Sequence, residues 1–152
     1  MRRAVCVCLI AFVFASTAGP ALAVTSPPPR AALDGFVCER ASNALDRVIA
    51  VVGVMRPVTG TQRMQMRFVL QRRDAVTNSF TVVQGGDLGR WRSPTPATLG
   101  QQPNDVWRLR KLVANLPGPA TYRFRVTFRW LGTSNTVLGR STLTSGTCSQ
   151  PQ

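Results

Sequence analysis

The chain has 152 residues, enough for one domain with its own core but not for two sizeable ones. It carries 19 Lys and Arg against 6 Asp and Glu, a formal net charge of +13, and no histidine. A positive charge of this size predicts attraction to polyanions whatever the fold. The absence of histidine removes the commonest general base and metal ligand, which argues against most enzyme classes.

The first 23 residues have the three parts of a secretory signal. Arg2 and Arg3 precede an apolar run over residues 4–15, and small residues follow up to Ala23, the end of an A-x-A cleavage site. The alternative is a retained membrane anchor, but the apolar run is shorter than the ~20 residues that span a bilayer. We therefore expect cleavage after Ala23, no transmembrane segment in the mature chain, and a secreted or extracytoplasmic protein associated with the cell envelope.

The mature chain is expected to begin with an extended leader. Residues 24–33 contain three consecutive prolines, which cannot donate backbone hydrogen bonds. Residues 34–152 then form a single domain. Cys6 and Cys8 lie inside the signal, so Cys38 and Cys148 remain. In an oxidising compartment this pair predicts one disulfide, and export disfavours the alternative of two buried free thiols.

The domain divides into short apolar or alternating segments separated by turn residues, a pattern typical of an all-β sandwich. One helix over residues 39–53 competes with this interpretation, but its density of β-branched residues and its terminal glycine favour a strand. The expected strands are residues 35–40, 46–55, 63–72, 80–83, 106–113, 121–131 and 136–148.

Residues 121–131 alternate most clearly. Arginines occupy one side of this predicted strand, at Arg123, Arg125 and Arg129, and large apolar residues occupy the other. Because successive side chains of a strand point to opposite faces, the apolar set is expected in the core and the arginines in water. The core set is Tyr122, Phe124, Val126, Phe128 and Trp130.

The segment before this strand resembles the tyrosine corner of immunoglobulin-like and fibronectin type III sandwiches, and of CARDB-like adhesion modules of bacterial surface proteins. Leu116 precedes Tyr122 by six residues, with a Pro- and Gly-rich bend between them. The resemblance implies a two-sheet antiparallel Ig-like β-sandwich of about seven strands, in which the phenol hydroxyl bonds to backbone upstream. The tryptophan positions and the end-to-end cysteine pair depart from those families.

The same resemblance implies that residues 63–72, 121–131 and 136–145 share one sheet. The outward side chains of the first two strands would then lie side by side. This arrangement would form a candidate anion-binding face of Arg63, Arg67, Arg123, Arg125 and Arg129. The alternative is a solvated surface that only keeps the protein soluble.

Other motifs point to structure rather than chemistry. Met64 and Met66 could be soft ligands for Cu(I), but they continue into Phe68 and Leu70 as one core-facing row. Residues 84–91, QGGDLGRW, match neither phosphate-loop pattern and predict a turn or bulge. The carboxylates form no recognisable catalytic pair. We expect no cofactor, no metal and no enzymatic activity.

These observations predict an exported, noncatalytic binding or adhesion module of the bacterial cell envelope. The alternative is an accessory protein attached electrostatically to an anionic envelope polymer or polysaccharide through the arginine-rich sheet face. The partner is thus either a protein of unknown identity or an anionic polymer. Nucleic acid is the least favoured partner, because the aromatic residues of the 121–131 strand face the core and offer no stacking platform.

Overall fold

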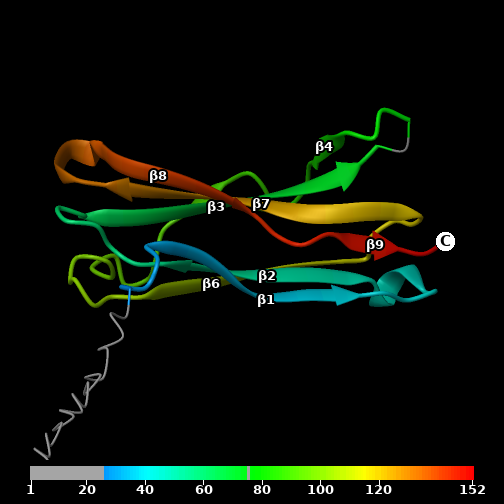
Figure 1. Cartoon of the computed structure of the whole chain (residues 1–152), viewed down its shortest axis with the longest axis horizontal. Coiled ribbons are helices and arrows are strands. Elements are labelled where there is room, and N and C mark those ends of the chain that lie inside the picture. The colour runs from blue at the N-terminus through cyan, green and yellow to red at the C-terminus, as the bar shows by residue number, and fades with distance from the viewer. Residues whose placement is uncertain (1–25, 75) are drawn as a thin grey trace, which may run out of the picture.

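The computed structural model describes residues 26–74 and 76–152, so the predicted signal over residues 1–23 lies outside the described residues. Within them the chain is an all-β sandwich of two antiparallel sheets packed face to face (Figure 1). No helix in this part of the chain is long and apolar enough to cross a membrane.

The smaller sheet has three strands in the order β1-β2-β6. These are β1 (Ala31–Glu39), β2 (Val48–Met55) and β6 (Trp107–Ala114). The first strand therefore includes the last residues of the segment expected as a leader. The second begins later than expected, because Ala44–Asp46 form a short 3-10 turn whose N-cap, Asn43, accepts a hydrogen bond from the backbone of Leu45 at 3.1 Å.

The larger sheet has six strands, with β3 (Arg63–Arg73) and β7 (Ala120–Leu131) paired at its centre. The outer edge of β3 pairs with β4 (Phe80–Val83) and β5 (Trp91–Arg92). The outer edge of β7 pairs with β8 (Val137–Thr144) and β9 (Cys148–Gln150). The expected grouping of the 63–72, 121–131 and 136–145 segments in one sheet is thus confirmed.

Nine strands are present in the described residues instead of the expected seven. One addition is β5, which is only two residues long. The other arises because the segment predicted as a single last strand divides into β8 and β9, which pair with different parts of β7. A second 3-10 turn, Thr133–Asn135, connects β7 to β8 at the predicted turn.

The core lies between the two sheets and follows the predicted alternation. The apolar set of β7 is almost completely buried, with exposed fractions of 0% for Phe124, Val126 and Phe128. Met64 and Met66 of β3 are also fully buried, next to Phe68 and Leu70. The methionines therefore belong to the hydrophobic core, where their thioethers fill space.

Two predicted devices hold the sandwich together. The hydroxyl of Tyr122 donates a hydrogen bond to the backbone carbonyl of Pro117 at 2.8 Å, and Leu116 is buried beside it, which confirms the tyrosine corner. The disulfide is also confirmed: Cys38 of β1 is bonded to Cys148 of β9, with 5.4 Å between their Cα atoms. This bond joins the smaller sheet covalently to the larger one.

The corner predicts how stability depends on pH. Burial raises the pKa of Tyr122, the single tyrosine of the chain. Because the folded-state pKa lies above the unfolded value of about 10, this phenol stabilises the fold fully below that pH and progressively less as the pH rises through it. We expect ultraviolet titration to detect phenolate formation only above the usual range, together with a falling urea midpoint.

Tyr122→Phe provides the control for this expectation. The free energy of unfolding of this variant should be lower by about 1 kcal/mol at neutral pH, because the hydrogen bond to Pro117 is removed. Its stability should then decline much less than that of wild type as the pH rises into the alkaline range. A phenol that titrates at its ordinary value in the folded protein would contradict the buried corner.

Candidate anion-binding face

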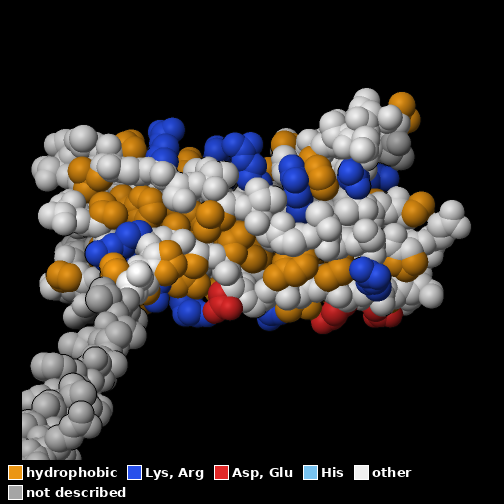
Figure 2. All heavy atoms as spheres, viewed as in Figure 1, with side chains coloured by type: hydrophobic (Ala, Val, Ile, Leu, Met, Phe, Trp, Pro, Cys, Tyr) orange, Lys and Arg blue, Asp and Glu red, His pale blue; other side chains and the backbone are white. Residues whose placement is uncertain are grey.

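The larger sheet is rich in arginine and free of acidic residues. Its strands carry nine arginines, four in β3, one in β5, three in β7 and one in β8, and none contains Asp or Glu. The acidic residues found in strands are Asp34 and Glu39 of β1 in the smaller sheet. In the view of Figure 2 the visible acidic side chains lie on the side of the smaller sheet, whereas basic side chains project from both sheets.

The register of β3, β7 and β8 places the predicted arginines on one outer surface. Gln65 of β3 pairs with Arg129 of β7, which in turn pairs with Arg140 of β8. All five residues of the candidate face lie on this surface, and two further arginines join them. We call this surface the arginine face; its members are Arg63, Arg67, Arg73, Arg123, Arg125, Arg129 and Arg140.

At one end of the face, two guanidinium groups lie over an indole ring. Trp91 pairs with Arg67 across the β5–β3 edge. The Cζ atoms of Arg67 and Arg129 lie 4.9 Å and 4.1 Å from the ring centroid, distances typical of cation–π contacts. The Nε of Arg129 also donates to the Oε1 of Gln65, the residue opposite it on β3, at 3.0 Å. We call Gln65, Arg67, Trp91 and Arg129 the Trp91 stack.

At the other end the same arrangement is built on a phenyl ring. Phe80 of β4 pairs with Arg73, and the Cζ atoms of Arg73 and Arg123 lie 5.9 Å and 3.6 Å from its ring centroid. The Nε of Arg123 donates to the Oε1 of Gln71, its register partner on β3, at 2.9 Å. We call Gln71, Arg73, Phe80 and Arg123 the Phe80 stack.

The positive charges of this face are not neutralised by carboxylates of the described residues. The ion pairs found there join Arg92 and Lys111 to Asp87, and Arg108 to Asp34, so none involves the arginine face. Partial burial, and then the charges of three neighbouring arginines, lower the pKa of Arg129; the neighbours are Arg140, Arg63 and Arg67. Arg129 and Arg140 are direct cross-strand partners, an arrangement of like charges that destabilises a sheet.

Two donors of the face lack an acceptor. The Nε atoms of Arg63 and Arg67 are buried and donate to no acceptor in the described part of the protein. Buried donors are nearly always paired in native proteins, so such an atom indicates a place where water or an ion completes the structure. Both donors lie among guanidinium groups, so the face holds unsatisfied hydrogen-bonding capacity as well as positive charge.

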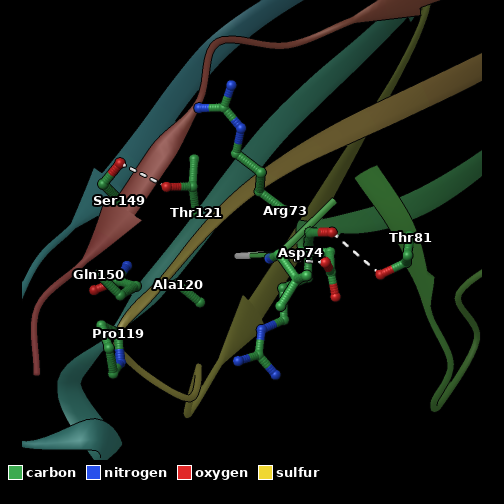
Figure 3. A pocket seen from close by; sticks show the side chains of 10 residues that line it. Arg73, Asp74, Thr81, Pro119, Ala120, Thr121, Ser149 and Gln150 are labelled. Atoms are coloured by element: carbon green, nitrogen blue, oxygen red, sulfur yellow. Dashed lines mark hydrogen bonds between the residues drawn. The ribbon is translucent and has the colours of Figure 1, made fainter. Parts of the chain in front are cut away.

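A pocket of about 560 Å³ opens beyond the Phe80 stack (Figure 3). Arg73 belongs both to this stack and to the lining of the pocket. Thr121 and Ser149 form another part of the lining, and their hydroxyl groups are 3.0 Å apart. The carboxylate of Asp74 lies here too, but it accepts hydrogen bonds from the backbone and the hydroxyl of Thr77 and from the backbone of Val76, which hold its pKa below the usual value.

Residues 84–91, which the sequence predicts as a turn or bulge, lead from β4 into β5 and place Trp91 on the face. The backbone amide of Gly89 donates to the carbonyl of Phe68 at 2.8 Å. Asp87 of the same loop is bonded to Lys111 of β6 in the smaller sheet, which holds the loop against both sheets; this ion pair lowers the pKa of Asp87. Trp91 then enters β5, where its side chain is half-buried.

Sequence reasoning did not assign six residues of the two stacks and of the face to this surface. Gln65 and Gln71 meet their arginines only through the register of β3 with β7. Arg73 continues the odd-numbered outward set of β3 but lies one residue beyond the predicted strand end. Arg140 shares the face only through the register of β8 with β7. The aromatic residues of the 121–131 strand face the core, as expected. Phe80 and Trp91 come from strands too short to show alternation, and they bring aromatic rings to the face, which the sequence did not predict.

The described residues, 26–74 and 76–152, hold no group of three or more His, Cys, Asp or Glu side chains that could bind a metal ion. Comparison of the chain with family models, with curated proteins and with solved structures finds no significant match. The arrangement of the arginine face is therefore the main guide to function.

Proposed function

We propose that this protein is a noncatalytic binding module that attaches to an anionic polymer through the arginine face. The observation that carries the proposal is the combination of seven arginines on one sheet surface with an absence of acidic residues from all strands of that sheet. A surface that only kept the protein soluble would not need guanidinium groups stacked on rings and fixed by glutamine. These contacts restrain the arginines in place, which lowers the entropic cost of binding a ligand.

The proposal places the protein outside the cytoplasm, at a cell envelope. It is supported by the predicted signal and by the disulfide, since such bonds persist in oxidising compartments. Arginine suits this role because its planar fork donates two parallel hydrogen bonds to one oxyanion. The polymer would lie on the sheet surface, with the smaller sheet turned away from it.

Charge reversal on the face tests this function. The triple variant Arg123→Glu, Arg125→Glu, Arg129→Glu should bind immobilised heparin at least ~10-fold more weakly than wild type at constant salt, a loss of about 1.4 kcal/mol or more. The matched control is Arg40→Glu, Arg90→Glu, Arg110→Glu, which changes the net charge equally at exposed positions outside the face. The control should lose much less affinity, because net charge alone acts weakly and at long range.

Equal losses in the two triple variants would refute the proposed site and leave only net charge. If the face variant kept its attachment to envelope material while losing heparin binding, recognition of a protein partner by the loops would replace our proposal. Circular dichroism of both variants should show that the sandwich is intact.

A further inference from the structure

The two stacks of the arginine face are copies of one arrangement. In each stack, an arginine of β7 lies opposite a glutamine of β3 and donates a hydrogen bond from its Nε to the glutamine side chain. A second arginine follows this glutamine by two residues on β3. An aromatic residue of an edge strand is the register partner of the second arginine. A shift of six residues along β3, from Gln65 to Gln71, converts one stack into the other. The same shift on β7, in the opposite direction, takes Arg129 to Arg123.

An even shift keeps every side chain on the same face of a strand, so both stacks point in the same direction. Six residues of β-strand span about 20 Å at roughly 3.3 Å per residue. Between the stacks lie Val69 on β3, and Arg125 and Thr127 on β7. The surface between them is thus continuous sheet with a further positive charge.

We propose that the two stacks are equivalent subsites for one linear phosphate polymer, which lies along β3 and occupies both at once. This inference rests on the proposed function and specifies its ligand. Each stack brings two guanidinium groups onto one ring, and this doubled charge matches two adjacent phosphates of a linear chain, each of which carries one negative charge and oxygens that a planar guanidinium fork can bind. The glutamine holds Nε of the β7 arginine, and Gln65 also accepts a hydrogen bond from Nη2 of Arg129. The remaining guanidinium N–H groups are left for the ligand.

The Trp91 stack carries the stronger evidence for an anion. The unpaired Nε of Arg67 lies within it, and Arg63 and Arg140 add charge beside it. The Phe80 stack adjoins the pocket of Figure 3, into which the polymer chain could continue past Arg73. A short ligand occupies one stack and makes the contacts of one subsite. A longer chain that is already bound at one stack reaches the second without a further encounter in solution, so its affinity is higher.

Inorganic polyphosphate of graded chain length tests this spacing. Chains shorter than about 20 Å should bind weakly, and the affinity should rise by about 100-fold or more once the chain spans both stacks. The Trp91 stack is disabled by Arg67→Gln with Arg129→Gln, and the Phe80 stack by Arg73→Gln with Arg123→Gln. Either pair of substitutions should abolish this stepwise rise in affinity, so that long chains bind no more tightly than short ones.

The matched control is Arg40→Gln with Arg110→Gln, which removes the same charge elsewhere and should preserve the step. If a glutamine pair impairs folding, Arg67→Lys with Arg129→Lys keeps the charge, loses the planar fork, and should still remove the step. Polyglutamate of matched length should bind at least ~10-fold more weakly than polyphosphate, because its carboxylates stand on flexible side chains whose ordering costs entropy, whereas the charged oxygens of polyphosphate belong to the polymer backbone itself.

A smooth rise of affinity with chain length, with no step, would overturn the two-subsite inference and leave the arginine face as a polyanion surface. Equal binding of polyglutamate would overturn the assignment of phosphate. If polyphosphate of every length fails to bind while heparin still binds, the assignment of phosphate fails and the proposed function remains. If neither polymer binds, or if the control pair weakens binding as much as the stack pairs, the proposed function itself fails. The results that would refute the proposed function therefore differ from those that would refute the two subsites.

Discussion

Replacing Cys38 and Cys148 together with alanine is expected to lower the free energy of unfolding by about 4 kcal/mol. The bond closes a loop with a sequence separation of 110, and the chain-entropy model assigns a cross-link of this span a stabilisation on the order of 4 to 5 kcal/mol. A domain of this size has a total stability of about 5–15 kcal/mol, so the loss is a large fraction of it. Urea denaturation of the disulfide-bonded protein and of the variant measures it.

The effect should be specific to the link between the sheets. Cys148 is fully buried next to Gln150, whose side-chain amide also donates to the carbonyl of Glu39 at 3.0 Å, so the two strands keep one polar contact after the bond is removed. Ser149→Ala, an exposed change between these residues, is the control and should alter stability by less than about 0.5 kcal/mol. A double cysteine variant within about 1 kcal/mol of wild type would show that the link contributes little.

Phe124→Ala is expected to destabilise the protein by about 3–5 kcal/mol, the range for removing a buried phenyl group and leaving a cavity. Phe124 has an exposed fraction of 0% and packs edge to face against Phe68, with ring centroids 6.4 Å apart. Its strand neighbour Arg125 points the opposite way and is exposed. Arg125→Ala should therefore change stability by less than about 0.5 kcal/mol.

This adjacent pair tests the alternation of β7 directly, with thermal and urea unfolding of both variants as the measurement. Similar losses at the two positions would mean that β7 is covered on both faces. The prediction would then be wrong about the orientation of the strand, and the arginine face would not be a free surface.

The alternation of residues 121–131 allowed the orientation of β7 to be predicted, because a period of two assigns each side chain to a face without knowledge of the partner strands. The tyrosine corner and the disulfide were also predictable, one from the spacing of Leu116 and Tyr122 and the other from the number of cysteines that lie outside the predicted signal. These features depend on local spacing and on simple counting, both of which a sequence shows.

The two stacks could not be predicted, because they depend on which residues face each other across strands. Trp91 lies on the face only because β5 pairs with β3, where its register partner is Arg67, a residue distant from Trp91 in the sequence. The pairing of Gln65 with Arg129 likewise depends on the register of β3 with β7. Register is determined by packing of the whole sandwich, and no single strand contains it.

The most direct test of the arginine face as the ligand site is a nuclear magnetic resonance titration with long polyphosphate chains. The protein has three tryptophans: Trp91 lies on the face, whereas Trp107 and Trp130 are buried in the core. We predict that the indole N–H signal of Trp91 and the Nε–H signals of Arg67 and Arg129 shift on binding, while the other two indole signals stay in place. Shifts confined to β6, or spread evenly over all exposed arginines, would contradict the account.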